Sequence, residues 1–220
     1  MSNINIVSSL KFAYLYKVKI TSLFASFSGL FKSTFIFTIA NIIEKGLPFL
    51  ILPLLTHAMA PEQFSYIALF TGIFAFTNYT IGVSAQSYIS VAYFKENSPQ
   101  FKQLVYSSVL VFLSSFLINL LALLLVPNFF ETYAGLSFFY IFLSLVSSLG
   151  IGLLSILLSI YRSQNKAKHY AVLQILRSLV DVALTLIFVL QFDLSWMGRI
   201  WGITAANAFI GLVALIIIYK

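Results

Sequence analysis

Apolar residues along the chain occur in six continuous runs that are separated by short polar stretches. Each run is long enough to cross the ~30 Å hydrocarbon core of a bilayer as a helix, which rises about 1.5 Å per residue. A strand of a membrane barrel would instead alternate apolar and polar residues over about ten positions. The pattern therefore predicts an all-α, polytopic membrane protein with six transmembrane helices. The predicted spans are residues 33–55, 66–90, 104–126, 138–161, 170–190 and 197–219.

Composition narrows the class of protein further. Of the 220 residues, 60% are hydrophobic and only 9% are charged, and the mean hydropathy is +0.99. A soluble domain carries about 25% charged residues, so a water-soluble fold is excluded. The chain has no cysteine, which excludes a disulfide framework, a thiol nucleophile and a cysteine-based zinc site. Residues 1–32 precede the six-helix unit at 33–220 and are expected to form a cytoplasmic or interfacial segment, with a frayed tail as the alternative.

The positions of the basic residues predict how the spans are oriented. With six crossings, ten of the thirteen basic residues fall on one side of the membrane, and Arg199 is the one basic residue on the other. Loops rich in Lys and Arg face the cytoplasm, so both termini are expected on the cytoplasmic side of the inner (plasma) membrane. The ten residues are Lys11, Lys17, Lys19, Lys32, Lys95, Lys102, Arg162, Lys166, Lys168 and Lys220.

Four ionisable residues lie inside the predicted spans: Glu44, Lys45, Arg177 and Asp181. Such a group costs about 2.5–3.5 kcal/mol at the centre of a membrane helix and therefore usually marks a functional site. Glu44 and Lys45 are adjacent and point about 100° apart, so they cannot pair well with each other. Two structural alternatives stay open. Arg177 and Asp181 have the i,i+4 spacing of an ion pair that only stabilises the bundle, and Lys45 could extend to the membrane surface.

Other polar residues extend these charges into stripes along the helices. Asn41 and Lys45 share one face of the first span, and Arg177 and Asp181 share one face of the fifth. Asn78 belongs to a weaker stripe on the second span. Polar stripes on two or three membrane helices are expected to face one another or a water-filled cavity.

Two prolines in the first span also suggest a polar cavity. Pro48 and Pro53 each remove a backbone hydrogen bond and can bend the helix. A charged pair followed by two prolines suggests a helix that bends beside a polar cavity, as transporters use.

The remaining polar and small residues are interpreted as structural. Asn119 and Asn207 are expected to form hydrogen bonds between helices. His57 and His169 have no second ligand nearby, so no metal site is expected. No catalytic residue is expected, because the chain has no glycine-rich phosphate loop, no HExxH and no Gly-x-Ser-x-Gly. Small residues of the fourth and sixth spans are expected to form packing faces: Ser144, Ser148, Gly152, Ser155, Ser159, Gly198, Gly202 and Ala206.

Two stretches carry a resemblance to a known family. Glu44 to Phe70, which includes LPLLT and PEQF, resembles the first helix and first outer loop of polysaccharide flippases, the Wzx-type transporters of O-antigen and capsule. Tyr161 to Asp181, YRSQNKAKHYAVLQILRSLVD, resembles the loop between their helices four and five. The similarity covers roughly residues 30–220 and indicates the MATE-like superfamily of multidrug, oligosaccharidyl-lipid and polysaccharide exporters.

The resemblance implies a specific activity. Such proteins have two six-helix lobes around a cavity and flip undecaprenyl-pyrophosphate-linked oligosaccharide, apparently coupled to a proton or sodium gradient. Six helices would then be one lobe, whose partners are the substrate, membrane lipids and a second lobe or a second copy; no nucleic acid and no further cofactor are expected. The implied cavity residues are Asn41, Lys45, Asn78 and Arg177, and the implied ion-coupling residues are Glu44 and Asp181.

Three other functions stay open at this stage. A multidrug exporter of the same superfamily would favour cavity acids, whereas acids and bases balance here. A membrane-embedded enzyme of polysaccharide assembly would need a long outer loop or clustered carboxylates and histidines. An inactive, truncated fragment is the third alternative.

Overall fold

The computed structural model describes residues 31–82, 85–95, 98–125, 132 and 135–220. The described residues contain helices and connecting turns and no strand. Six helices are long and apolar enough to cross a membrane, which confirms the predicted all-α, polytopic class. The predicted segment at residues 1–32 lies almost wholly outside the described residues, which begin at Phe31. The six spans are Phe31–Ala58, Gln63–Lys95, Pro99–Leu125, Phe138–Ser163, Ala167–Gln191 and Ser195–Tyr219.

These spans are built from the following elements. The first helix comprises residues 31–50 and is followed by α2. The second span contains α3 and α4, and the fifth ends in a turn of π-helix, η1. The bounds are α2 Leu52–Ala58, α3 Gln63–Gly82, α4 Ala85–Lys95, α5 Ser98–Leu125, α7 Phe138–Ser163, α8 Ala167–Leu186, η1 Ile187–Gln191 and α9 Ser195–Tyr219.

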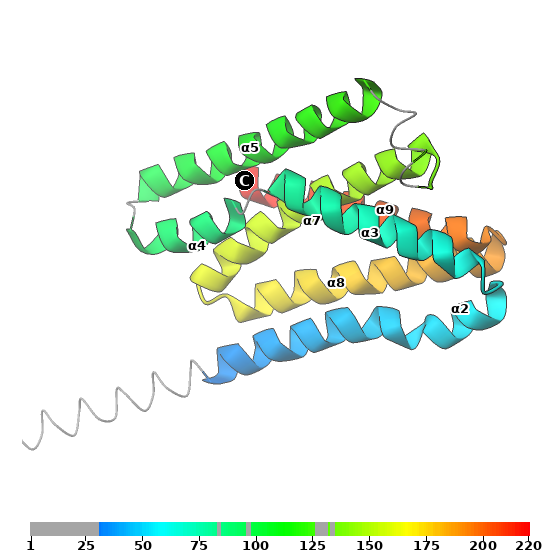
Figure 1. Cartoon of the computed structure of the whole chain (residues 1–220). Coiled ribbons are helices and arrows are strands. Elements are labelled where there is room, and N and C mark those ends of the chain that lie inside the picture. Colours follow the sequence, from blue (N-terminus) through cyan, green and yellow to red (C-terminus); the bar gives the residue numbers. More distant parts are fainter. Residues whose placement is uncertain (1–30, 83–84, 96–97, 126–131, 133–134) are drawn as a thin grey trace, which may run out of the picture.

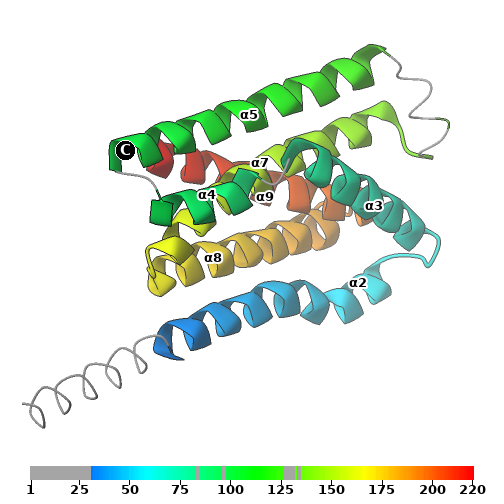
Figure 2. The same ribbon diagram turned by 60° about the vertical axis from the view of Figure 1, so that its left-hand side comes forward.

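The helix α7 is the centre of the bundle. It contacts α3, α4, α5, α8 and α9. In its most apolar stretch 72% of the residues are buried, against 11% in that of the first span. Figures 1 and 2 show the first helix lying along α8 at one edge of the bundle, while α5 lies at the opposite edge. The first helix and α8 are therefore the elements on which the predicted charges meet.

Close approach of α7 to α9 depends on residues without side chains. A Cβ at Gly211 of α9 would lie 2.5 Å from the Cα of Gly150 on α7, and a Cβ at Gly150 would overlap the backbone of Asn207. Small residues at a crossing let two membrane helices gain van der Waals contact along their backbones. The predicted packing faces are confirmed where an added Cβ would overlap neighbouring atoms, at Gly152, Gly198 and Gly202.

Replacement of Gly150 by alanine is expected to lower the free energy of unfolding by about 1–3 kcal/mol, because the backbone of α9 cannot yield as a side chain could. The matched control is Gly72→Ala on α3, where an added Cβ meets nothing within 4 Å. Thermal unfolding of both variants in detergent measures the difference. Equal unfolding temperatures for the two variants would contradict the close crossing.

Polar side chains also join the helices. The hydroxyls of Thr77 on α3 and Ser148 on α7 are 2.7 Å apart, and both residues are buried. The Thr80 hydroxyl donates to the amide oxygen of Asn119 on α5 at 3.1 Å. This bond confirms the interhelical role predicted for Asn119.

Candidate functional site

A polar cavity of about 430 Å³ opens between the first helix, α3, α4, α7 and α8. Its volume falls within the range of small-molecule sites, roughly 300–1,000 Å³. The lining is rich in hydroxyl and amide groups, although the surrounding helices are apolar. The lining residues are Glu44, Phe74, Asn78, Gln86, Ser87, Ser90, Ile151, Ser155, Leu158, Ser159, Arg162, Tyr170, Gln174 and Arg177.

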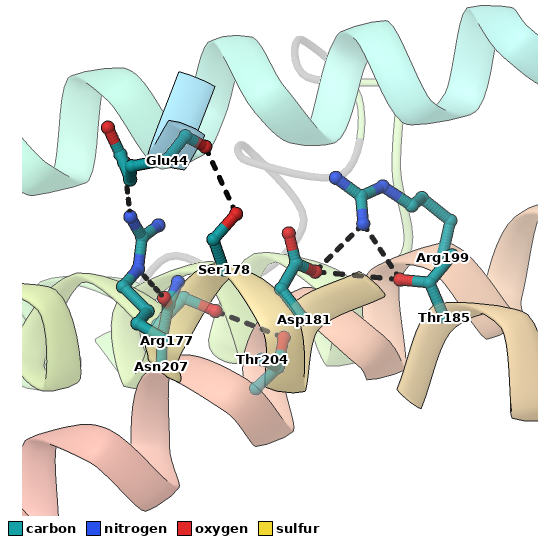
Figure 3. A network of polar contacts seen from close by, with 9 residues as sticks. Glu44, Arg177, Ser178, Asp181, Thr185, Arg199, Thr204 and Asn207 are labelled. Carbon is teal, nitrogen blue, oxygen red and sulfur yellow. Dashed lines mark hydrogen bonds and ion pairs between the residues drawn. The ribbon is translucent and has the colours of Figure 1, made fainter. Parts of the chain in front are cut away.

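An ion pair between the first helix and α8 forms one wall of the cavity. Arg177 Nη1 lies 2.6 Å from Glu44 Oε1, and each side chain is 17% exposed. The Arg177 Nε donates to the amide oxygen of Asn207 on α9 at 2.9 Å (Figure 3), which confirms the interhelical bond predicted for Asn207. Arg177 thereby ties together three helices, and its charge is balanced by Glu44.

A proline makes the first helix able to bind α8 through its backbone. Pro48 has no N–H, so the carbonyl of Glu44, four residues earlier, lacks its normal helical donor. The hydroxyl of Ser178 donates to this carbonyl at 3.1 Å, as Figure 3 shows. The regular helix is then interrupted by a turn at Ile51, before Pro53 in the first turn of α2. The interruption lies between the two prolines for which a bend was predicted.

A second ion pair joins α8 to α9. Arg199 Nη1 lies 2.8 Å from Asp181 Oδ1 and donates to the Thr185 hydroxyl at 2.7 Å (Figure 3). Asp181 and Arg199 are 10% and 13% exposed. The alternative of an ion pair between Arg177 and Asp181 within α8 is wrong, because each residue pairs with a different helix.

The predicted site residues divide into three groups, of which Asp181, paired with Arg199 outside both linings, is one. Glu44, Asn78 and Arg177 line the same cavity. Lys45 instead lies on an exposed face of the first helix, and the structure does not bring it to Arg177. It lines a separate shallow groove with Thr38, Asn41, Ile42, Gly46 and Phe49.

Asn41 connects the first helix to the start of α8. Its amide oxygen accepts a hydrogen bond of 2.9 Å from the hydroxyl of Tyr170, which in turn accepts one of 3.1 Å from Arg162 Nη2. The turn between α7 and α8 brings Arg162 and Tyr170 together. Asn165 takes a left-handed conformation there, with φ of 55°, which asparagine tolerates better than most residues.

The described part of the chain contains no cluster of side chains that could bind a metal ion. No three His, Asp or Glu side chains among these residues come close enough to hold one ion. His57 Nδ1 lies 2.8 Å from the carbonyl of Pro53 in its own helix.

Comparison with known families decides the class of the protein. A family model described as polysaccharide biosynthesis protein matches residues 30–220, which include all six membrane spans. The chain belongs to the polysaccharide biosynthesis protein family. The resemblance carried by the LPLLT and PEQF stretches is therefore confirmed at the level of the family. No curated protein and no solved structure matches the chain significantly.

Family membership and the six apolar helices together make this polysaccharide biosynthesis protein a multi-pass membrane protein. Two charged residues, the cavity cation Arg162 and the Asp181 partner Arg199, were not found from the sequence. Arg199 falls near a span end, where it is interpreted as a loop residue, and Arg162 looks like one more cytoplasmic loop cation. The spacing Tyr170, Gln174, Arg177 along one face of α8 is the signal that could have located the cavity wall.

Proposed function

We propose that the protein is a transporter, not an enzyme, and that it flips undecaprenyl-pyrophosphate-linked oligosaccharide across the inner membrane for O-antigen or capsule synthesis. The observation that carries this proposal is the hydroxyl- and amide-lined cavity inside a membrane bundle of a polysaccharide biosynthesis protein. Serine, asparagine and glutamine side chains can exchange hydrogen bonds with sugar hydroxyls. Arginine matches the geometry of phosphate oxygens.

An ion gradient can act on this cavity through Glu44. While Glu44 is ionised it neutralises Arg177 at 2.6 Å, so Arg177 is not free to bind a pyrophosphate. Uptake of a proton or a sodium ion by Glu44 would weaken the pair and release Arg177 for the anionic substrate. Asp181 is a weaker candidate for coupling, because its carboxylate pairs with Arg199 and does not contribute to the cavity lining.

A second lobe is part of the proposal, either from a longer polypeptide or from a second copy. Lys45 is exposed near the middle of the first span, about 21 Å along the helix from Phe31. A charge at that depth is costly against lipid chains. A second lobe facing the groove that contains Lys45 would give this cation polar surroundings, with both termini of the present lobe on the cytoplasmic side.

Filling the cavity tests the proposal. Ser155→Leu adds an apolar side chain to the lining. It leaves no group on another helix without its hydrogen-bond partner, because the Ser155 hydroxyl donates only within α7, to the carbonyl of Gly152. We expect at least a tenfold loss of surface polysaccharide in cells that depend on this protein. The matched control is Ser114→Leu on the exposed face of α5, which should leave polysaccharide unchanged. Normal polysaccharide with Ser155→Leu, at a normal level of membrane protein, would refute the transport role.

A further inference from the structure

One cation in the cavity lining is held in place without a carboxylate partner in the described part of the chain. Arg162 at the end of α7 donates to the Tyr170 hydroxyl at 3.1 Å, and its Cζ lies 5.4 Å from the centre of the Tyr170 ring. Tyr170 is only 2% exposed and is itself fixed by its hydrogen bond to Asn41. Among the described residues, the ion pairs are those of Arg177 and Arg199. Arg162 therefore presents an oriented guanidinium with unused donors.

A buried acceptor lies one helical turn along α8 from Tyr170, in the same cavity lining as Arg162. Gln174 follows Tyr170 by four residues on the same face of α8, so the two side chains are neighbours. The Gln174 side chain lines the cavity and is 9% exposed, and within the described part of the chain its Oε1 accepts no hydrogen bond. An unsatisfied buried acceptor is uncommon in folded proteins and calls for an explanation. A ligand hydroxyl in the cavity would supply the missing donor.

Charge divides the cavity into two parts. At Arg177 the positive charge is cancelled by Glu44, whereas at Arg162 no described carboxylate cancels it. Among the described lining residues, Arg162 is therefore the uncompensated cation that an entering anionic group meets. The same lining contains the Gln174 acceptor, which lacks a donor. A phosphate ester of a polyhydroxylated group satisfies both requirements.

We propose that Arg162 and Gln174 form a docking subsite for a sugar phosphate, in which Arg162 binds the phosphate and the Gln174 amide oxygen accepts a hydrogen bond from a sugar hydroxyl. This assignment rests on the proposed transport function, because it identifies the part of the substrate that the cavity binds first. Tyr170 is a positioning residue that orients Arg162. Arg177 takes up an anion only after Glu44 releases it.

Binding of glucose 1-phosphate and of glucose to the purified full chain in phosphatidylcholine nanodiscs tests the subsite. Arg162→Met should weaken glucose 1-phosphate at least tenfold and leave glucose within twofold. Gln174→Leu should weaken both probes about tenfold, and because it removes an unsatisfied buried group it should not lower the melting temperature. Absence of glucose 1-phosphate binding to the unsubstituted chain, or equal affinities in all variants, would overturn the proposal.

Two controls separate the cavity from general attraction between charges. Lys166→Met removes an exposed cation of the adjacent α7–α8 turn, which does not line the cavity, and should leave both affinities unchanged. Phosphatidylglycerol also carries a phosphate beside hydroxyls, so the titration is repeated in nanodiscs that contain it. Unchanged affinity supports a substrate subsite, whereas loss of glucose 1-phosphate binding would assign the subsite to a membrane lipid and overturn the proposal.

The subsite and the transport function can fail separately. If Ser155→Leu abolishes surface polysaccharide while Arg162→Met leaves glucose 1-phosphate affinity unchanged, the subsite is wrong and transport stands. If glucose 1-phosphate binding depends on Arg162 while Ser155→Leu leaves polysaccharide normal, the subsite stands and transport is wrong.

Discussion

Arg199→Met is expected to lower the free energy of unfolding by about 3–5 kcal/mol, because it leaves the carboxylate of Asp181 buried without its partner. The carboxylate is only 10% exposed, and inside a membrane span little water is available to solvate it. Methionine keeps much of the length of the arginine side chain, so the loss comes from the charge and not from a large void. Reversible unfolding in mixed detergent micelles measures the effect.

The double variant Asp181→Leu, Arg199→Met is the control for this prediction. Replacing both members of a buried ion pair by apolar residues is often neutral or stabilising. The double variant should therefore recover most of the stability that Arg199→Met loses. Recovery is expected to be incomplete, because the double variant also removes both side-chain partners of the buried Thr185 hydroxyl. A double variant as unstable as the single one would show that the pair is not the source of the effect.

The six spans and the polar faces of the first, second and fifth spans could be predicted from the sequence, because each depends on residues close together along the chain. Ser155 and Ser159 of α7 are interpreted from the sequence as packing residues, but they line the cavity. Continuous apolar runs give the spans, and the stripe containing Arg177 gives the polar face of α8. Pro48 likewise has a local effect, which frees the carbonyl of Glu44 four residues earlier.

The partners of the charges could not be predicted, because they depend on how the helices cross. An i,i+4 spacing makes Arg177 and Asp181 the obvious local pair, yet Glu44 and Arg199 come from other helices and take their places. The crossing of α7 and α9 at Gly150 and Gly211 is equally non-local. It fixes which face of α9 meets α8, and hence where Asn207 can accept its hydrogen bond from Arg177.

The same limit explains Lys45. Its stripe with Asn41 correctly identifies a polar face of the first helix, but that face is not the one that meets Arg177. Glu44, on the shoulder of the stripe, is the residue that faces α8. A rotation of about 100° separates adjacent residues on a helix, so the choice between Glu44 and Lys45 rests on packing against α8 that the sequence of one helix does not contain.

Arg177→Met is expected to destabilise the fold by about 3–5 kcal/mol and to abolish surface polysaccharide. It leaves Glu44 unpaired at the cavity wall and removes the donor to Asn207, whose Nδ2 already lacks a partner among the described residues. Loss of polysaccharide in this single variant alone could therefore follow from loss of folded protein. Stability in detergent and the amount of protein in the membrane are measured together with surface polysaccharide.

The double variant Glu44→Gln, Arg177→Met separates stability from transport. It removes both charges of the pair while the introduced amide can still accept and donate hydrogen bonds, so the unfolding free energy should return to within about 1 kcal/mol of the original. Surface polysaccharide should stay absent, because the cavity has lost both the cation for the pyrophosphate and the carboxylate proposed to couple the ion. Recovery of polysaccharide together with stability would make the pair a structural tie between the first helix and α8 and nothing more. Recovery of stability without polysaccharide would support the proposed transport step, in which Arg177 leaves Glu44 and binds the anionic substrate.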